Sequence, residues 1–504
     1  MARRAKRSGK AGTARPADAP RGGVRIRHYC QGIGDCHLLR FPRAEGGDFT
    51  MLIDCGVHPS VKGGAERMRA VVDDVAATTG GRIDLLVVTH EHMDHLSGFL
   101  SAAARFAEIE VGDVWFGWTE NPGDPQVAEL DRFKADAAAA LALTGSRLAA
   151  APDDAALAGL RTGLNAMLGF YFGAKGERVR AARDAARNCA TGRVVYHEPG
   201  AGPLALPGVD GVRIYVLGPP RDLRQLRIDY RASETYGSAF GFGPVASRGL
   251  MMALGYGGDD WDAPFDPEIG LELADVLPLA LDPKGRVGAR EHAAADRRTT
   301  VELLRHFYAG PGPGKDPALA DQSWRRIDFE QFTMSAELAL QLDRMTNNCS
   351  LVLAFELAAT GRVLLFTGDA QVGSWLSWQD LEWSSGGQRV TGPELLARTV
   401  FLKVAHHGSH NATLKGKGLE LMADPDLSAF VPVNAGDATK VGWREMPFDA
   451  ILDELDRRTA GRVIRADAPW IAAGAIPFKW TGRSGSLTVA GIGPAGLWVE
   501  LDVV

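Results

Sequence analysis

The stretch "LLVVTHEHMDHLSGFL", Leu85 to Leu100, places three histidines and an aspartate within six positions directly after an apolar run. The apolar run predicts a short buried strand, and strand ends are favoured places for sites in α/β folds. His90 and His92 are two apart, so in an extended loop their rings can point the same way; Asp94 and His95 follow. Neutral imidazoles and a carboxylate suit Zn²⁺, and also Mn²⁺ or Fe²⁺. We therefore interpret the stretch as a metal site rather than a polar loop with chance histidines.

One loop rarely completes a metal site, and two further strand ends supply candidates. "VLLFTGDA" places Asp369 just past an apolar strand, and "FLKVAHHGSH" places His406 and His407 past another. A carboxylate such as Asp369 can bridge two ions about 3.5–4 Å apart. Each motif alone is a weak signal, because a Gly-Asp pair after a strand is usually only a turn. Together with the first loop they indicate a two-metal site.

The order of the remaining segments predicts an α/β fold. Residues 24–90 contain strand, strand, helix and strand patterns, and residues 349–433 contain a second series of apolar strands. The two series are expected to form the two sheets of one sandwich covered by helices. The segment from about residue 120 to 190 is rich in alanine, which predicts a helical insertion. Residues 221–330 are rich in glycine, proline and charge, which predicts long loops with a few helices.

The motifs resemble those of the metallo-β-lactamase superfamily and, within it, the soluble hydrolase domain of ComEC-type DNA-uptake proteins and their free-standing relatives. The resemblance covers roughly residues 24–100, 345–410 and, more weakly, 430–500. Its motifs are "QGIGDCHLL", "MLIDCG", "THEHMDHLSG", "NNCSLVL", "LLFTGDA" and "LKVAHHGS". It implies an αββα sandwich in residues 24–504, with the two insertions added and the site at one edge.

The resemblance also implies a role for each residue of the site. His90 and His92 would hold one metal ion, Asp94 and His95 the other, and Asp369 would lie between the two ions. His406 aligns best with the last histidine ligand of the superfamily, which leaves His407 to face the substrate or to support a metal ligand from behind. Three further positions complete the assignment: Asp54 as a brace of the metal loops, Asp35 near the site, and Ser409 as a phosphate contact.

The chain departs from the wider superfamily at one place. A third histidine normally completes the first metal position a little over twenty residues before the bridging aspartate, and here that region reads "MTNNCS". Asn347 or Asn348 can offer an amide oxygen, which is a harder and weaker ligand than imidazole. The first ion is therefore expected to bind loosely and to prefer Mn²⁺ to Zn²⁺. His197, in "VVYHEPG", is a less favoured alternative ligand.

Two divalent ions, Zn²⁺ or Mn²⁺, make hydroxide available near neutral pH and neutralise phosphate oxygens. Asp94 is expected to orient the hydroxide, and His407 to protonate the leaving oxygen. The same apparatus hydrolyses a lactam or a thioester, so the metal site alone does not choose the substrate. The resemblance favours a phosphodiester in DNA, RNA or a nucleotide.

Charge restricts how a nucleic acid would bind. Residues 1–27 carry a formal charge of +8 and the whole chain −6, so residues 28–504 carry −14 and a basic whole-domain surface is unlikely. A local groove for a single strand remains an alternative to ordinary solvated surface for Lys403, Lys415, Lys417, Arg444 and Arg462. Trp375, Trp378 and Trp383 could stack on bases, but core packing is favoured.

The N-terminal composition, the apolar runs and the cysteines indicate the compartment in which the protein is expected. Residues 1–23 are expected to form a disordered basic tail, and no apolar run long enough to span a membrane is present. Five scattered cysteines without a CxxC pair suggest reduced thiols in a cytoplasmic protein.

The expected function is therefore a cytoplasmic dinuclear metallohydrolase, a nuclease or phosphodiesterase. One alternative is a hydrolase of a small ester, lactam or thioester, whose pocket the helical insertion would roof. Another is a metal-stabilised binding or scaffold protein in a DNA-processing or defence complex, with protein partners on the insertions. The oligomeric state is left open.

Overall fold

The computed structural model describes residues 18–150, 177–228, 230–236, 327–481 and 487–504. The chain divides into two compact units. The first contains Met1–Phe133, Gly169–Ala239 and Leu342–Val504, and the second contains Lys134–Leu168 and Phe240–Gln341. Both strand series lie in the first unit, and the second unit falls within or beside the segments that the sequence marks as insertions.

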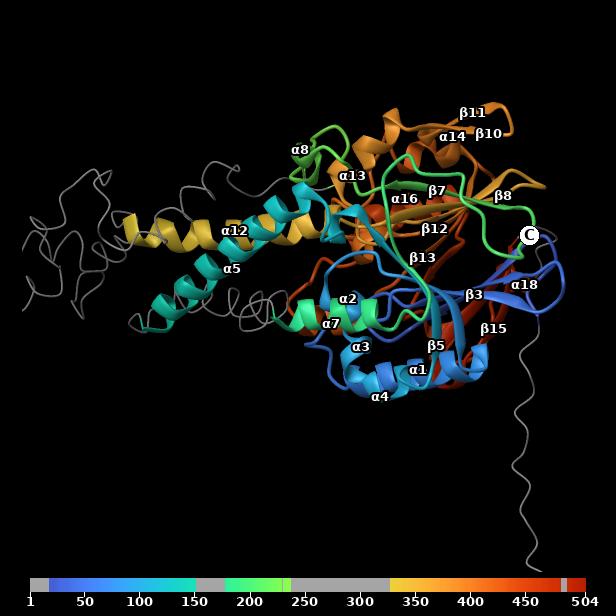
Figure 1. Ribbon diagram of the computed structural model, residues 1–504, viewed down its shortest axis with the longest axis horizontal. Coiled ribbons are helices and arrows are strands. Elements are labelled where there is room, and N and C mark those ends of the chain that lie inside the picture. The colour runs from blue at the N-terminus through green and yellow to red at the C-terminus, as the bar shows by residue number, and fades with distance from the viewer. Residues whose placement is uncertain (1–17, 151–176, 229, 237–326, 482–486) are drawn as a thin grey trace, which may run out of the picture. The chain divides into compact units, whose positions relative to one another are not determined.

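An eight-stranded sheet forms one layer of the first unit, in the order β15-β16-β1-β2-β3-β4-β5-β6 (Figure 1). Strands β3 to β6 run parallel to one another, and the others pair antiparallel. The strands are β1 (Val24–Tyr29), β2 (His37–Pro42), β3 (Asp48–Ile53), β4 (Arg82–Val87), β5 (Glu110–Gly117), β6 (Val194–His197), β15 (Leu487–Ile492) and β16 (Trp498–Val503).

A six-stranded sheet forms the second layer, in the order β14-β13-β12-β9-β8-β7. Strands β9, β12, β13 and β14 are parallel, and β7 and β8 are antiparallel to their neighbours. The strands are β7 (Val212–Gly218), β8 (Val352–Leu357), β9 (Arg362–Phe366), β12 (Thr399–Lys403), β13 (Ser428–Val431) and β14 (Val463–Arg465). A separate hairpin consists of β10 (Glu382–Ser385) and β11 (Gln388–Thr391).

The inner faces of the two sheets share one apolar core. Phe41 of the first sheet lies against Phe355 of the second, with ring centroids 5.8 Å apart, and Phe355 meets Phe366 edge to face. These rings are almost fully buried, so their burial is a main source of the free energy that holds the layers together. The two strand series therefore form the two sheets of a sandwich, as the sequence predicts.

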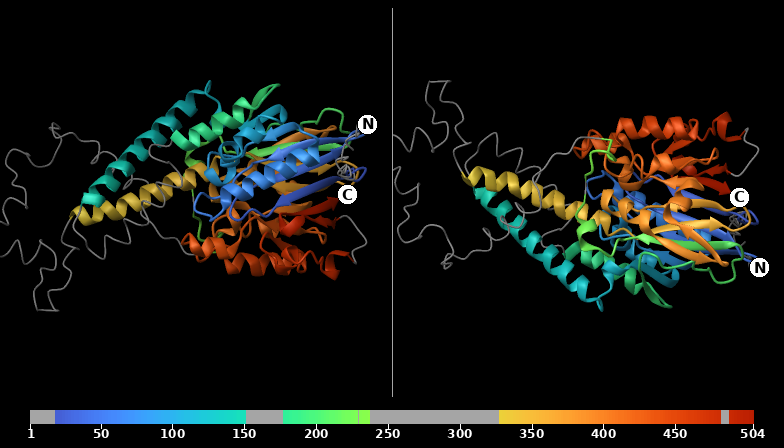
Figure 2. Two further views of the ribbon diagram at one scale, coloured as in Figure 1. Left: turned by 90° about the horizontal axis from the view of Figure 1, so that it is seen from below. Right: turned by 90° about the horizontal axis from the view of Figure 1, so that it is seen from above.

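Helices cover the outer faces of both sheets (Figures 1 and 2). On the first sheet they are α1 (Gly64–Thr79), α2 (Met93–Leu96), α3 (Gly98–Ser101), α4 (Ala103–Phe106) and α7 (Glu177–Asn188). On and beside the second sheet they are α8 (Leu223–Leu226), α13 (Val372–Ser377), α14 (Gly392–Ala397), α15 (Ala435–Lys440) and α16 (Asp449–Thr459). The short α17 (Pro469–Ala472) and α18 (Phe478–Thr481) follow β14.

The predicted insertions are described only in part. The helical insertion contains α5 (Pro125–Ala150) and α7, and residues 151–176 between them lie outside the described residues. Most of the predicted 221–330 loops, residues 237–326, also lie outside them, as does the predicted tail up to residue 17. The long helix α12 (Ile327–Asn348) leads back into the second sheet.

Two expectations about single residues find a clear outcome. Trp375, Trp378 and Trp383 are buried in the core, which confirms packing as their role. His197 is also buried, with its ring edge-on to Trp115 at 4.3 Å, and it belongs to neither of the candidate metal groups found among the described residues. No helix in the described part of the chain is long and apolar enough to cross a bilayer.

Candidate metal centre

The predicted ligands gather where parallel strands of both sheets end. Asp54 follows β3 and the histidine loop follows β4, while Asp369 follows β9 and the two adjacent histidines follow β12. The carboxyl ends of parallel strands lie along one edge of a sheet. In this fold, the carboxyl ends of β3 and β4 in the first sheet lie beside those of β9 and β12 in the second. This topology joins residues that are about 270 positions apart in the sequence.

Asp94, His95, Asp369 and His407 form one compact group in which the ligand atoms all lie within 4.8 Å of one another. His407 Nε2 lies 2.8 Å from Asp94 Oδ2 and 3.5 Å from Asp369 Oδ2, and His95 Nε2 lies 3.1 Å from Asp369 Oδ2. Two donors bound to one ion at about 2.0–2.2 Å lie roughly 3–4 Å apart, so these separations match one shared ion.

The group also contains polar atoms that the described residues leave without hydrogen-bond partners. These atoms are Asp94 Oδ1, His95 Nε2 and Asp369 Oδ2, and all three residues are buried. An unpaired buried polar atom is costly, and a divalent cation satisfies all three at once. The donor set therefore fits a divalent metal ion.

Asp54 supports this group from behind. Its Oδ1 accepts from the Thr89 backbone N–H at 2.8 Å, and its Oδ2 accepts from the Thr89 hydroxyl at 2.6 Å and lies 2.8 Å from His95 Nδ1. Asp54 itself adopts a left-handed backbone conformation, with φ 55°. A carboxylate on one ring nitrogen orients the other nitrogen toward the metal, so Asp54 holds His95 Nε2 in place.

His90 and His92 form a separate pair, with His90 Nε2 and His92 Nδ1 3.0 Å apart. The other nitrogen of His90 lies 3.0 Å from the Thr89 hydroxyl and 3.3 Å from the Ser350 hydroxyl. The other nitrogen of His92 faces Asp343 Oδ1 of α12 at 3.7 Å. The outer nitrogen of each ring thus faces a protein group, and the inner nitrogens, His90 Nε2 and His92 Nδ1, face each other. Two ligands of a common ion would be arranged in this way.

The two asparagines of "NNCS" have different surroundings. Asn348 donates to the Leu226 and Ile228 carbonyls and accepts from the Gln371 and Ser374 backbone N–H groups, so its amide braces loops. Asn347 is fully buried, and its Oδ1 has no hydrogen-bond partner among the described residues. Of the two, only Asn347 retains an oxygen for a metal ion.

The adjacent histidines after β12 also differ. Both have positive φ, 42° at His406 and 54° at His407, and this tight turn sends their rings in different directions. His407 joins the carboxylates, with Nδ1 held 3.0 Å from the Pro432 carbonyl. His406 instead lies beside Gln371 Nε2 at 3.0 Å and Asn347 Nδ2 at 3.4 Å. The geometry favours His407 rather than His406 as the ligand beside Asp94, the reverse of the assignment made from the sequence.

A buried lysine supplies a positive charge behind the site. Lys403, at the end of β12, forms an ion pair with Asp35, donates to the Gly368 carbonyl at 2.7 Å and lies 3.4 Å from Asp369 Oδ1. It is 1% exposed, so it belongs neither to a substrate groove nor to the solvated surface, the two alternatives that the sequence leaves open. Arg462 is also unsuited to that role, because it bonds the Leu427 and Pro425 carbonyls.

The electrostatics of the cluster follow from its crowded charges. Burial alone lowers the pKa of a histidine, but Asp369 and Asp94 outweigh it and raise the pKa of His95 well above its ordinary value. Asp369 likewise raises the pKa of His407 against burial. Burial raises the pKa of Asp369, but His95, His407 and Lys403 hold it well below the usual range. Without metal, the cluster therefore retains protons that an ion displaces.

Ser409 lies in the same turn but its hydroxyl is engaged, donating to Asn411 Oδ1 at 3.1 Å. Sequence reasoning missed Thr89, Asp343, Ser350, Gln371 and the role of Lys403. Among these residues the sequence contains a signal only for Lys403. It stands within the apolar run "VFLKVA", which predicts a buried strand, and a buried lysine needs a carboxylate partner.

Residues 31–125 match the family model of the metallo-beta-lactamase superfamily, whose members are metal-dependent hydrolases. The match contains β2 to β5 and the histidine loop, and it ends before Asp369. Comparison with curated proteins and with solved structures gave no match. The two-sheet sandwich with outer helices is the αββα architecture of this superfamily, extended by insertions.

Proposed function

We propose that the chain is a dinuclear metal-dependent phosphodiesterase or nuclease that acts on DNA, RNA or a nucleotide. The observation that carries the proposal is the buried group of Asp94, His95, Asp369 and His407, which presents two carboxylates and two imidazoles to one point. His90 and His92, whose Nε2 and Nδ1 atoms lie 3.0 Å apart, would hold a second ion. When bound, such ions make a hydroxide nucleophile available near neutral pH and neutralise phosphate oxygens.

The residues of the chain have distinct tasks in this proposal. Asp94 and Asp369 would hold an ion, and Asp54 and the Pro432 carbonyl fix the rings of His95 and His407. Asn347 offers its amide oxygen where a third histidine stands in relatives, so the ion at His90 and His92 would bind loosely and prefer Mn²⁺ to Zn²⁺. His407 acts as a ligand, and Asp35 balances Lys403.

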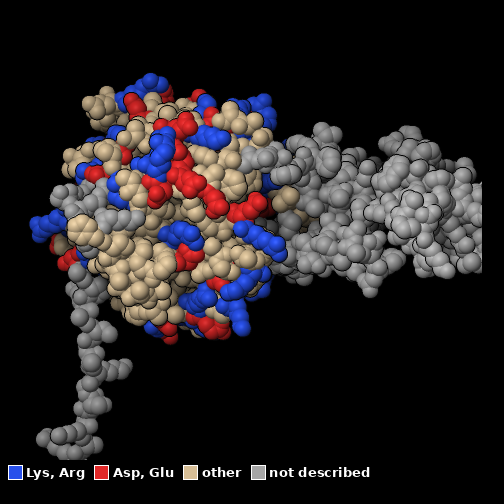
Figure 3. All heavy atoms as spheres, turned by 180° about the vertical axis from the view of Figure 1, so that it is seen from behind, with Lys and Arg blue, Asp and Glu red and all other residues tan. Residues whose placement is uncertain are grey.

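The resemblance of "NNCSLVL", "TGDA" and "HHGS" to ComEC-type hydrolase domains supports a phosphodiester substrate. Positive and negative side chains are interspersed on the described surface in Figure 3, which suits a local contact with a single strand better than a duplex-wide basic face. A cytoplasmic setting, as in DNA processing or defence, accords with this substrate.

An assay of substrates tests the proposal. Wild type, Asp94→Ala and the exposed control Asp453→Ala are incubated with single-stranded DNA, RNA, cyclic nucleotides and a lactam panel, with Mn²⁺ or Zn²⁺. Cleavage of a phosphodiester by wild type and the control, but not by Asp94→Ala, is expected. Cleavage of lactams alone would support the small-ester or lactam hydrolase, and inactivity on every substrate would support a binding protein.

A further inference from the structure

Residues 432–448, here called the rim loop, surround the turn that carries His407. The loop begins at Pro432, whose carbonyl holds His407 Nδ1 at 3.0 Å. It ends with the Phe448 N–H donating to the Gly408 carbonyl at 2.9 Å. Pro447 lies so close that a Cβ at Gly408 would come within 2.9 Å of it. Both ends of the rim loop are therefore fixed to the metal-binding turn.

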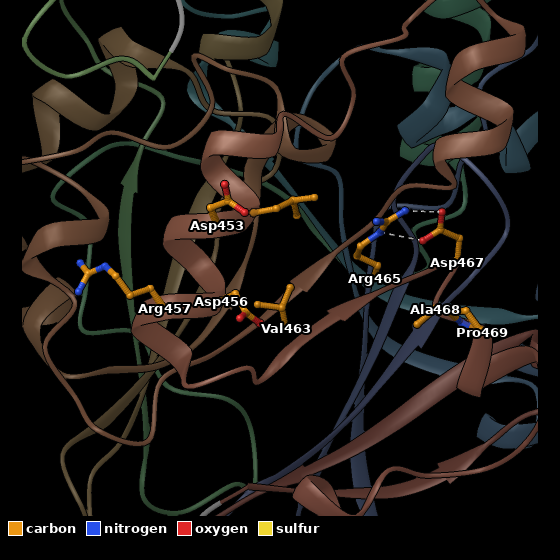
Figure 4. A pocket seen from close by; sticks show the side chains of 9 residues that line it. Asp453, Asp456, Arg457, Val463, Arg465, Asp467, Ala468 and Pro469 are labelled. Carbon is orange, nitrogen blue, oxygen red and sulfur yellow. Dashed lines mark hydrogen bonds and ion pairs between the residues drawn. The ribbon is translucent and has the colours of Figure 1, made fainter.

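The start of helix α15 in the rim loop is also fixed. Asn434 caps the helix by accepting from the Asp437 N–H at 2.9 Å, and Asp467 accepts from the Ala435 N–H at 2.9 Å. Asp467 is oriented by a two-point ion pair with Arg465, which lines the open groove of about 650 Å³ in Figure 4. That groove contains none of the metal-site residues. The Arg465–Asp467 ion pair at its edge supports the start of α15.

Trp443 of the rim loop lies against His58, with ring centroids 4.7 Å apart and planes at 81°. Its backbone is fixed by the Ala438 carbonyl at 2.8 Å. His58 is 4% exposed, its N–H donates to the Ile33 carbonyl, and its Nδ1 accepts from the Ser60 N–H at 3.1 Å. Trp443 is half-buried, so a rigidly supported indole keeps part of its surface accessible.

His58 places this indole beside the metal cluster. Residues 54–57 lie directly on the segment that carries Asp94: the Cys55 N–H donates to the His95 carbonyl, and a Cβ at Gly56 would overlap Asp94 backbone atoms at 2.3 Å. His58 directly follows this segment in the chain. Trp443 therefore lies against the residue next to the segment that packs on Asp94 and His95.

A second half-buried aromatic residue, Phe448, also contacts the residues next to the turn. Phe448 meets the His410 ring at 6.1 Å, and the His410 carbonyl accepts from the Tyr236 N–H at 3.3 Å. Lys415 Nζ lies 5.2 Å from the Tyr236 ring centre. Arg444 and Glu445, which follow Trp443, carry opposite charges that cancel. The rim loop is therefore distinguished by its aromatic surface and not by net charge.

We propose that Trp443 is a stacking platform for a nucleobase of a single strand whose phosphodiester lies at the Asp94–His407 cluster. The inference rests on the proposed function and deepens it by naming a substrate contact. Every base has an aromatic face, whereas a paired base inside a duplex offers none, so stacking selects unpaired strands without reading their sequence.

The test compares a normal oligonucleotide with one of the same backbone that lacks bases. Binding of fluorescent phosphorothioate single strands, which resist hydrolysis, is measured by anisotropy with Mn²⁺-loaded protein. Trp443→Ala is expected to weaken binding of the normal strand roughly tenfold and to leave the abasic strand unchanged. Trp443→Phe should retain most of the affinity, and Phe478→Ala, which removes an 84% exposed ring on α18, should change neither strand.

Metal content by mass spectrometry must stay equal in all variants, because Trp443 is not a ligand. An equal loss for both strands in Trp443→Ala, or no loss for either, overturns the stacking role while the proposed function stands. Failure of wild type to bind any strand, while it cleaves a lactam or nothing, overturns both.

Discussion

At the scale of the residue, three imidazoles of the site each have one nitrogen held by a protein group and the other turned to the site. His95 is held by Asp54, His407 by the Pro432 carbonyl, and His90 by the Thr89 and Ser350 hydroxyls. This support fixes tautomer and ring orientation before an ion arrives, which lowers the entropy cost of metal binding. The family resemblance indicates Asp54 as a support, but not the Pro432 carbonyl or the Ser350 hydroxyl, which come from loops far away in the chain.

The two adjacent histidines allow a direct test of ligand identity. His407→Ala is expected to weaken the tighter metal site at least 100-fold, because the group loses one of its four donors. His406→Ala should change that site less than about fivefold, since His406 lies beside Asn347 and Gln371. Isothermal titration with Mn²⁺ and Zn²⁺ measures both. The opposite ranking would restore His406 to the position that the sequence assigns to it.

Lys403 shows why residue roles are harder to predict than ligand motifs. In the sequence it is one lysine near a motif, and a surface role is the ordinary expectation. In the structure it lies between Asp35 and Asp369, and its ammonium group balances carboxylates that are otherwise buried together. Only the packing of β12 between β9 and β13 decides between these roles.

At the scale of the element, helix α7 is connected to the histidine loop by charge. Arg183 Nη1 forms an ion pair with Glu91 Oε1, and Glu91 is the residue between His90 and His92. The same nitrogen lies 3.2 Å from Glu120 Oε2. The side chains of Glu91 and Glu120 are 7% and 2% exposed. The alanine-rich pattern predicts that helices exist here, but not that one of them holds the metal loop.

Arg183→Met is therefore expected to lower the free energy of unfolding by roughly 2–4 kcal/mol, because two nearly buried carboxylates lose this cation. Urea denaturation of the metal-free protein measures the change. Arg193→Met, at an 80% exposed arginine that pairs with Asp113, is the matched control and should cost less than about 0.5 kcal/mol. Similar losses in the two variants would contradict a role for Arg183 in holding the loop.

At the scale of the whole first unit, the sandwich could be predicted because its strands are marked by apolar runs between turns. The pairing that matters for the site is of a different kind. The β3–β4 and β9–β12 pairs are parallel, and their carboxyl ends come together only when two sheets from distant segments pack face to face. The strand patterns and strand-end motifs suggest that the two sheets pack together, but the edge at which the site lies comes from the family resemblance.

Metal binding and protonation compete across this assembled site, which predicts a pH dependence of stability. In metal-free protein the pKa values of His95 and His407 lie above the ordinary 6.5, raised chiefly by Asp369. The stability that these raised values contribute is complete below about pH 6.5 and is lost as pH rises through the folded values. A divalent ion replaces the lost protons, and its affinity increases over the same range.

The melting temperature of chelator-treated protein is therefore expected to fall as pH rises above 6.5, while that of Mn²⁺-loaded protein changes less. Differential scanning fluorimetry at constant ionic strength measures the gap between the two, which should widen with pH. His407→Ala removes one of the two groups with a raised pKa and one metal ligand, so it should reduce this widening. A gap that narrows toward high pH would show that protons and metal ions do not compete for these histidines.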